Sequence, residues 1–387
     1  MIGSELIAER NLLLHVTGGK IISRQILPAA LIPPAVKTHD NFIPLAEDTT
    51  LLPSLIDAHT HLALDGEDFK RSRICWDDWQ TMLPRLEKAK EQYLQAGIAH
   101  IRDGGDLAGI NLKAKRYFYN ESECGLHIIS TGEAVRPKNG YGAFLGKGYS
   151  NLKEIEGQVE VLALSGADQV KVVISGVVSF KRYGEVEGPL IPQDELTLVT
   201  RCAHHKGLKV MAHASSDAAV KLAIKAGVDS VEHGYFLGRD SLKLMAEKEI
   251  AWVPTIIPVA IQIRMPYRKE RNAHEIDVIT RTYEEQIEKL SYAAELGVPL
   301  GVGTDAGALG VRHGVSLVEE MLLFAESALD NRSILQAATV GNAAILGLGK
   351  ENGSIDKGRR ANMIAVQGDP LNDLGALHEI AAHFIPL

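Results

Sequence analysis

Short apolar runs alternate with helix-like segments from Leu51 to about Leu346, and this rhythm limits the folds open to the chain. The runs that we interpret as strands are LLPSLIDAH, IAHIRDGG, LHIISTGEA, QVKVVISG, LKVMAHAS, SVEHGY, AWVPTII and VPLGVGTDAG. Strands that alternate with helical segments indicate βα units and a parallel sheet. Eight units are the number in a (β/α)8 TIM barrel, so the sequence predicts an α/β fold built on that barrel.

The segments between the strands support this interpretation. The amphipathic stretches 84–97, 193–207 and 216–227 each end on a glycine, where a helix C-cap favours one. The two ends of the chain differ from the middle and carry short β-like runs and turns. We expect residues 1–52 and 347–387 to form one small β-rich, sandwich-like domain, and residues 53–346 to form the barrel.

Composition excludes several classes of protein. With 387 residues, 45% of them hydrophobic, the chain is ample for a large core, and its formal net charge of −8 argues against a nucleic-acid partner. Three cysteines without CxxC spacing favour a reducing compartment. We find neither a signal peptide nor an apolar run of about 18 residues that would cross a membrane. We therefore expect a cytoplasmic protein with a small-molecule substrate and no membrane partner. Assembly into a homo-oligomer is a possibility that the sequence leaves open.

Metal-binding side chains stand where the proposed strands end. His59 and His61 close the first strand, and residues at i and i+2 of a strand face the same way. The fourth, fifth, sixth and eighth strands add Lys171, His213, His233 and Asp305. Nitrogen and oxygen donors of this kind suit a divalent transition metal. Six groups exceed the needs of one ion and suit two ions about 3.5–4 Å apart.

Lys171 is the informative member of this set because Val170, Val172 and Val173 surround it in the sequence. A buried ammonium is costly, and neighbouring metal ions would repel it. Both effects favour the neutral amine. A neutral amine can add CO₂ to give a carbamate, an anion with two oxygens that can bridge two metal ions.

The order HxH, Lys, His, His, Asp resembles that of the amidohydrolase superfamily. The flanking sequence resembles the prolidase-like, imidazolonepropionase-related branch of that superfamily. The matching segments are PSLIDAHTHL, VKVVISGVVS, KVMAHA, SVEHGY, VPT, GVGTDAG and GSIDKGRRANMIAVQGDP. The resemblance implies a barrel with a small β domain from both termini, and two metal ions that are usually zinc. It further implies that the inner ion is held by His59, His61 and Asp305, that the outer ion is held by His213 and His233, and that carboxylated Lys171 bridges the two.

The segment after the third strand departs from the family pattern. Many relatives carry a glycine-histidine loop there that helps to hold the substrate, whereas this chain reads STGEAVRPKNGYGAFLGKG. We expect Arg136 or Tyr141 to take its place, with Lys138 and Asn139 as alternatives. Arg264 and His313, after the seventh and eighth strands, are further candidates for substrate contact, although a charged loop such as 264–271 is more often a solvated face. Asp57 is a candidate for orienting His59.

The function that these features favour is metal-dependent hydrolysis of a C–N amide bond, by a metal-bridging hydroxide with Asp305 as general base and then acid. The substrate would be a dipeptide such as Xaa-Pro, an N-acyl amino acid, or a related small amide or carbamate. One alternative is a mononuclear deaminase or lactam hydrolase, which lacks the lysine and has an acidic residue at the position of Ser216. Another alternative is a non-catalytic barrel scaffold, in which ligands should be lost, whereas all six are present here.

Overall fold

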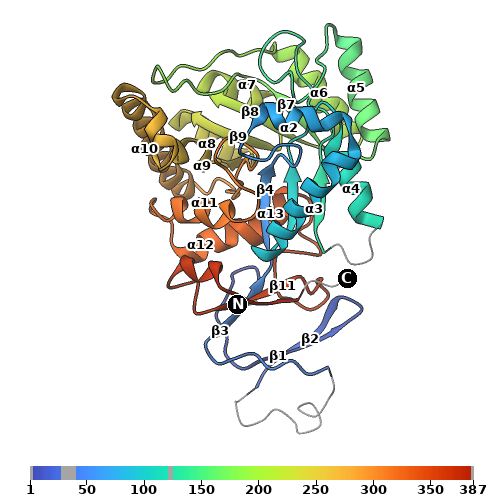
Figure 1. The fold of residues 1–387 in the computed structure, drawn as a ribbon, viewed down its shortest axis with the longest axis vertical. Coiled ribbons are helices and arrows are strands. Elements are labelled where there is room, and N and C mark those ends of the chain that lie inside the picture. The colour runs from blue at the N-terminus through green and yellow to red at the C-terminus, as the bar shows by residue number, and fades with distance from the viewer. Residues whose placement is uncertain (1–2, 28–40, 121–124, 385–387) are drawn as a thin grey trace.

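The computed structural model describes residues 3–27, 41–120 and 125–384, and within them a parallel barrel dominates the chain (Figure 1). Seven strands form most of its wall: β4 (Leu55–Thr60), β5 (Ile98–Asp103), β6 (His127–Ser130), β7 (Gln169–Val173), β8 (Lys209–Ser216), β9 (Ser230–Phe236) and β10 (Ala251–Val253). One set of hydrogen bonds joins β4, β5 and β6, and another joins β7 to β10. All of these neighbours are parallel, as the predicted βα units require.

Two seams close the barrel. Beyond β6, Val135 pairs with Val172 of β7. On the other side, the segment from Leu300 to Ala306 occupies the place of the eighth strand in the barrel wall, and we call this segment the eighth stave. It pairs with Trp252 of β10 at one end and with Thr60 of β4 at the other. The predicted eighth strand is therefore present as a connection, held by bridges and not by a continuous ladder. With this closure, the fold is a (β/α)8 barrel with an additional β domain.

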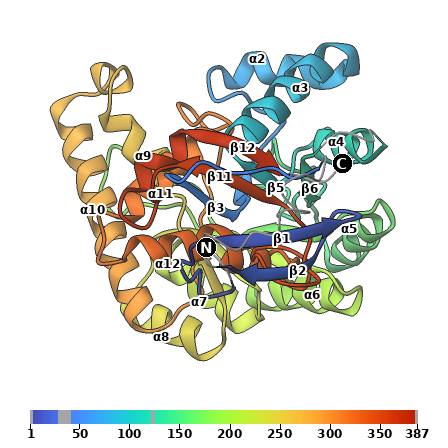
Figure 2. The same cartoon turned by 90° about the horizontal axis from the view of Figure 1, so that it is seen from below.

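Helices cover the outside of the barrel (Figures 1 and 2). They are α2 (Phe69–Ile74), α3 (Trp79–Gln95), α4 (Ile110–Asn120), α5 (Leu152–Leu164), α6 (Gln193–His205), α7 (Asp217–Ala226), α8 (Arg239–Glu247), α9 (Ile257–Ala260), α10 (Ala273–Glu295), α11 (Ser316–Phe324), α12 (Asn331–Gln336) and α13 (Asn342–Ile345). The predicted terminating glycines Gly97, Gly207 and Gly227 all have φ between 73° and 78°. That left-handed conformation is the reason a glycine ends these helices.

Strands from the N-terminal and C-terminal parts of the described chain lie together below the barrel in Figure 1, and in front of it in Figure 2. A hairpin of β1 (Leu12–Thr17) and β2 (Lys20–Ile26) lies beside a three-stranded sheet. That sheet joins β3 (Thr49–Pro53), β11 (Met363–Gln367) and β12 (Ile380–Phe384), all antiparallel. Ile21 of the hairpin and Met363 of the sheet share one small apolar core.

The apolar run LLPSLIDAH, which we predicted as one strand, is two strands in two different sheets. Leu51 and Leu52 belong to β3 in the terminal sheet, and the barrel strand β4 begins at Leu55. Ser54 lies between them and donates its main-chain N–H to the Asn362 carbonyl. The junction between the two parts of the chain therefore falls inside a single hydrophobic stretch, which hydrophobicity alone does not reveal.

Two further sequence expectations concern cysteines and membrane spans. Cys75 and Cys202 carry free thiols, whereas Cys124 falls outside the described residues. Across residues 3–27, 41–120 and 125–384, no helix combines the length and the apolar character needed to cross a membrane.

Candidate metal centre

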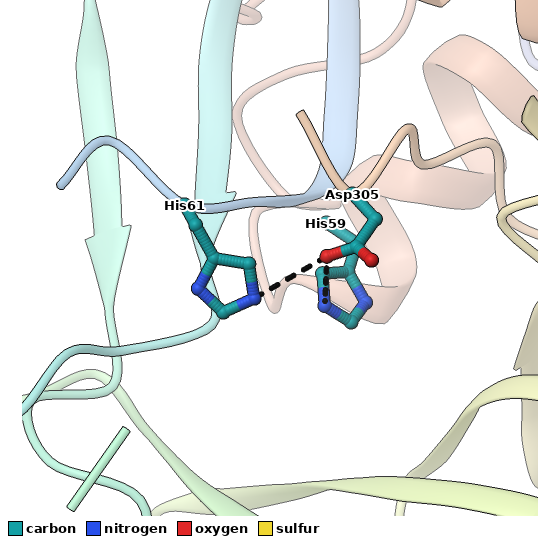
Figure 3. Close-up of side chains that lie close together, drawn as sticks. All are labelled: His59, His61 and Asp305. Atoms are coloured by element: carbon teal, nitrogen blue, oxygen red, sulfur yellow. Dashed lines mark ion pairs between the residues drawn. The ribbon is translucent and has the colours of Figure 1, made fainter. Parts of the chain in front are cut away.

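The end of β4 places two imidazoles beside one carboxylate (Figure 3). His59 and His61 are both buried, and Asp305 arrives from the eighth stave. Oδ1 of Asp305 lies 3.3 Å from Nε2 of His61 and 3.5 Å from Nε2 of His59. One ligand atom from each of the three residues falls within 4.8 Å of the others. The structure thus brings together the three residues that we assigned to the inner ion.

The main chain around these ligands is tightly fitted. The main-chain N–H of Asp305 donates to the His59 carbonyl at 2.7 Å, and Asp305 has the left-handed φ of 57°. Asp and Asn tolerate this conformation better than most residues with a side chain. Gly104 directly follows β5. A Cβ atom at this position would lie 2.7 Å from the His61 ring, so only glycine leaves space for that imidazole.

Lys171 of β7 reaches the same place from another part of the barrel wall. Its side chain is 1% exposed, and Nζ lies 3.2 Å from Nε2 of His59. No carboxylate oxygen of the described residues lies within 4.0 Å of this amine, so it has no ion-pair partner there. Burial lowers the pKa of Lys171 to about 8, which brings the neutral amine within reach near neutral pH.

His213 of β8 and His233 of β9 complete the cluster. Their ring centroids are 4.5 Å apart, and the His233 ring lies 5.0 Å from that of His59. His233 has a φ of 69°, which rotates its side chain out of the regular strand alternation. The structure therefore gathers all six predicted metal ligands at one mouth of the barrel. Lys171 and His213 lie within β7 and β8, before the strand ends at which we predicted them.

Each of the four imidazoles has one ring nitrogen bound by the protein. Nδ1 of His61 lies 3.0 Å from the Gly105 carbonyl, and Nε2 of His213 lies 3.1 Å from the Gly176 carbonyl. Nδ1 of His233 lies 2.7 Å from the Thr255 hydroxyl, and Nδ1 of His59 is bound by a carboxylate described below. Second nitrogens held in this way fix the tautomer of a metal-binding histidine.

The electrostatics of the cluster suit metal binding. Burial lowers the pKa of His59 to about 4 and that of His213 to about 3, so both imidazoles are neutral at pH 7. Burial on its own would raise the pKa of Asp305, but the hydrogen bond and charge of His61, together with the charge of Lys171, lower it to about 2. The same contact outweighs burial at His61 and raises the pKa of that imidazole, so its proton would have to leave when a metal ion binds. Neutral imidazoles and an ionised carboxylate are the forms that bind a metal ion.

A buried ion pair, which we did not predict, supports His59 from inside the barrel. Oε2 of Glu232 lies 2.7 Å from His59 Nδ1, and both Glu232 oxygens accept hydrogen bonds of 2.8 Å from Arg102 Nη2. Burial would raise the pKa of Glu232, but the charge of Arg102 and the His59 contact lower it to about 2. The only signal in the sequence was the position of Glu232 next to His233.

Asp57, which we expected to orient His59, has a different role. Its carboxylate accepts from the hydroxyl and the main-chain N–H of Thr304, at 2.6 and 3.1 Å, and from the His59 N–H at 3.2 Å. Asp57 therefore ties the eighth stave to β4 through the main chain, while Glu232 orients the imidazole.

His313, a predicted substrate contact, is occupied by the protein. Its Nε2 donates to the Leu64 carbonyl at 2.8 Å, and its Nδ1 lies 2.9 Å from the Tyr93 hydroxyl. The Tyr93 oxygen is also 2.5 Å from the hydroxyl of Thr60, the residue between the two histidines of β4. His313 thus holds the end of β4 against α3 and the segment after Asp305, and we correct its assignment to a positioning role.

Removing one hydroxyl tests this network. We expect Tyr93→Phe to lower the free energy of unfolding by about 1–3 kcal/mol, because it removes the 2.9 Å partner of the buried His313 Nδ1 and leaves the Thr60 hydroxyl with its longer bond to the Ala306 carbonyl. Urea unfolding of Tyr93→Phe and of the control Tyr119→Phe, whose ring is 86% exposed, measures the difference. Equal stabilities of the two variants would contradict the role of the network.

The remaining candidates for substrate contact fall in three different settings. Arg136 is buried and donates to main-chain carbonyls of its own segment, so we correct its assignment as a substrate ligand. Arg264 is exposed and lies 4.0 Å from Glu326. Tyr141 alone lies against the cluster, with its ring stacked on His213 at a centroid distance of 5.4 Å. Burial, and after it the charge of Asp305, raises the pKa of Tyr141 above its ordinary value.

A parallel barrel whose strand ends gather four imidazoles, a lysine and a carboxylate has the architecture and donor set of a metal-dependent hydrolase. Comparison with known proteins gives the family: the model of the amidohydrolase family matches residues 50–385, and the chain belongs to that family.

Individual relatives extend this result. An uncharacterized protein of Mycobacterium tuberculosis is 30% identical over 272 residues, which are 68% of this chain and 66% of that protein. Ochratoxinase of Aspergillus niger is 23% identical over 367 residues, covering 85% of this chain and 72% of that protein. The structure of a Xaa-Pro dipeptidase superposes with a TM-score of 0.78 at 23% identity, over 96% of this chain and 92% of that one. The A. niger ochratoxinase structure superposes with a TM-score of 0.73 at 21% identity, over 87% and 82% of the two chains.

Proposed function

We propose that this protein is a metal-dependent amidohydrolase that cleaves the C–N bond of a small amide. The observation that carries the proposal is the set of four buried imidazoles, each with one nitrogen bound by protein and the other left to the cluster. Structural histidines of a core have no need of such an arrangement. Membership of the amidohydrolase family and the likeness to a dipeptidase and an ochratoxinase support hydrolysis of an amide.

The residues fit two metal ions. His59, His61 and Asp305 would hold one ion, His213 and His233 the other, and zinc accepts such nitrogen and oxygen ligands. Lys171 fits a bridging role as a carbamate, which forms when its neutral amine adds CO₂ and releases one proton. Among the described residues the amine of Lys171 has no carboxylate partner, and the carbamate would place a negative charge at this buried position. When bound, the metal ions would polarise the substrate carbonyl and lower the pKa of water.

Asp305 would move the proton. Its carboxylate is ionised at neutral pH and lies at the barrel mouth, within 3.5 Å of two imidazoles. It would accept a proton from the attacking water at a carboxylate oxygen and return it to the leaving nitrogen. The leaving amine would then depart neutral, and the acyl group would be released as a carboxylic acid. Glu232 and Asp57 would keep the ligands on β4 in place during this exchange.

The substrate class that we propose comprises dipeptides such as Xaa-Pro, N-acyl amino acids and related small amides or carbamates. Tyr141 is the candidate for contact with it. A screen of zinc-loaded protein against these compound classes, followed by detection of the released amine, tests the function. Failure to hydrolyse any member of these classes, with metal bound, would overturn the proposal.

Metal analysis gives a separate test. We expect about two divalent ions per chain after reconstitution, loss of hydrolysis after chelation, and recovery when zinc is returned. A mononuclear deaminase or lactam hydrolase would hold one ion. A scaffold that had lost catalysis would take up none.

Lys171→Ala tests the bridging role. A ligand shared by two ions should matter at least as much as an outer-shell partner, so we expect metal affinity to fall by about 10–100-fold or more. The metal content should drop below two per chain, and hydrolysis should fall with it. The control is Lys115→Ala, because Lys115 pairs with Asp168 in a half-exposed ion pair on the outer surface. Full metal content and activity in Lys171→Ala would remove the bridging proposal.

A further inference from the structure

Arg136 holds the segment between β6 and α5 in one shape. Its side chain is 1% exposed, and its guanidinium donates only to main-chain carbonyls of the described residues. Nε donates to Tyr141 at 2.9 Å, Nη1 to Gly146 at 3.2 Å and Nη2 to Gly140 at 2.7 Å. A guanidinium presents its N–H groups in a rigid fork. One side chain therefore fixes the main chain on both sides of Tyr141.

Tyr141 projects from this segment onto the cluster. Its ring stacks on His213 with an interplanar angle of 30°, and the ring of Phe144 meets it edge to face at 5.9 Å. Asp305 is near enough for its charge to act on the phenol. The ring is thus held between an imidazole of the cluster and an apolar neighbour, with little freedom to rotate away.

The hydroxyl of Tyr141 differs from those of the other tyrosines in this region. Tyr149, in the same segment, donates to Glu195 at 2.6 Å, and Tyr93 is bound by Thr60 and His313. In the part of the chain that the structure describes, no donor or acceptor meets the Tyr141 hydroxyl. Tyr141 is only partly buried, and its hydroxyl is not one of the buried polar atoms that lack a partner. The hydroxyl is therefore accessible beside the cluster and free to bind a ligand there.

We propose that Tyr141 is a catalytic residue for the amide hydrolysis proposed above, and that its hydroxyl donates a hydrogen bond to the carbonyl oxygen of the substrate. The inference rests on that proposed function. As the nucleophile adds to the carbonyl carbon, the oxygen gains negative charge and the hydrogen bond strengthens. The proton stays on the phenol, whose ordinary pKa of about 10 keeps it in place at neutral pH. Arg136 is the positioning residue, because it acts through the main chain of Tyr141.

Removing the hydroxyl while keeping the ring gives the test. With N-acetyl-L-phenylalanine and L-alanyl-L-proline as probes, we expect Tyr141→Phe to lower kcat by about 10²-fold, the scale for one oxyanion donor. KM should change less than threefold, since the ring that contacts the ground state remains. Metal content and the urea midpoint should match those of the wild type. Tyr149→Phe removes a hydroxyl that faces Glu195 and should keep the wild-type kcat.

Arg136→Lys provides the second measurement. It keeps one positive charge but loses the fork, so we expect kcat to fall by about 10-fold with metal content retained. In the double variant with Tyr141→Phe, the effects should not add, because Arg136 acts only through Tyr141. Additive losses would overturn the positioning role.

The outcomes separate this inference from the proposed function. If the wild type hydrolyses a probe and Tyr141→Phe retains its kcat, the role of Tyr141 is wrong and the amidohydrolase function stands. If the zinc-loaded wild type hydrolyses neither probe nor any other amide of the screen, the proposed function fails, and the role of Tyr141 fails with it.

Discussion

Asp305→Asn should abolish most of the hydrolysis while leaving the fold intact. General acid–base catalysis by a positioned side chain contributes about 10²–10⁴-fold, and we expect kcat to fall by at least that factor because an amide cannot accept the proton of the attacking water. Asparagine has the same shape as aspartate and tolerates the left-handed φ of 57° at this position. The loss should therefore come from chemistry and not from misfolding. Steady-state kinetics with the best amide of the screen measures it.

The control for this variant is Asp240→Asn, because that side chain is 84% exposed on α8 and forms a surface ion pair with Lys243. Its kcat and its metal content should match those of the wild type. Metal analysis of Asp305→Asn then separates two effects: retention of two ions with a lost rate assigns Asp305 to proton transfer, and loss of one ion assigns it mainly to metal binding. A wild-type rate in Asp305→Asn would contradict both roles.

The barrel and the meeting of the six candidate ligands at its mouth were predictable because both follow from local pattern. In a parallel barrel every strand runs the same way, so residues that end separate strands meet at one mouth. His59, Lys171 and His213 could therefore be grouped before any contact was known. The eighth stave was recognisable as an apolar run ending in Asp305, although isolated bridges hold it in place of a regular ladder.

The support for the ligands was not predictable, because it depends on exceptions to strand alternation. Glu232 and His233 are adjacent, and a regular strand would send them to opposite faces. The left-handed φ of His233 lets both side chains approach His59. A sequence pattern with period two selects one member of the pair, and we selected the histidine.

The substrate residues were the least predictable part, because sequence gives a side chain's charge but not the groups that satisfy it. Arg136 carries a cation that we assigned to a substrate, whereas the structure uses it for main-chain carbonyls. Both ring nitrogens of His313 are likewise hydrogen-bonded to protein groups. For His313 the fold brings the distant Leu64 carbonyl to the ring, and for Arg136 the path of its own loop turns nearby carbonyls toward the guanidinium. Neither arrangement is recorded in a local sequence pattern.

Arg102→Met should produce the largest loss of stability. The variant leaves the Glu232 carboxylate buried without its cation, and removal of one partner of a buried ion pair costs about 3–5 kcal/mol in the free energy of unfolding. Both side chains are at most 1% exposed, so water is a poor substitute. Methionine keeps a similar volume and adds no polar group. Urea unfolding measures the change.

Two companion variants decide whether the uncompensated charge is the cause. Arg102→Met/Glu232→Gln removes the charge as well as the cation, and the amide oxygen can still accept from His59 Nδ1, so we expect most of the lost stability to return. Lys115→Met breaks the half-exposed ion pair with Asp168, and solvent screening limits its expected effect to about 0–1 kcal/mol. If the double variant is as unstable as Arg102→Met, packing around the guanidinium is the cause. In that case Glu232 would orient His59 without needing Arg102 to hold its charge.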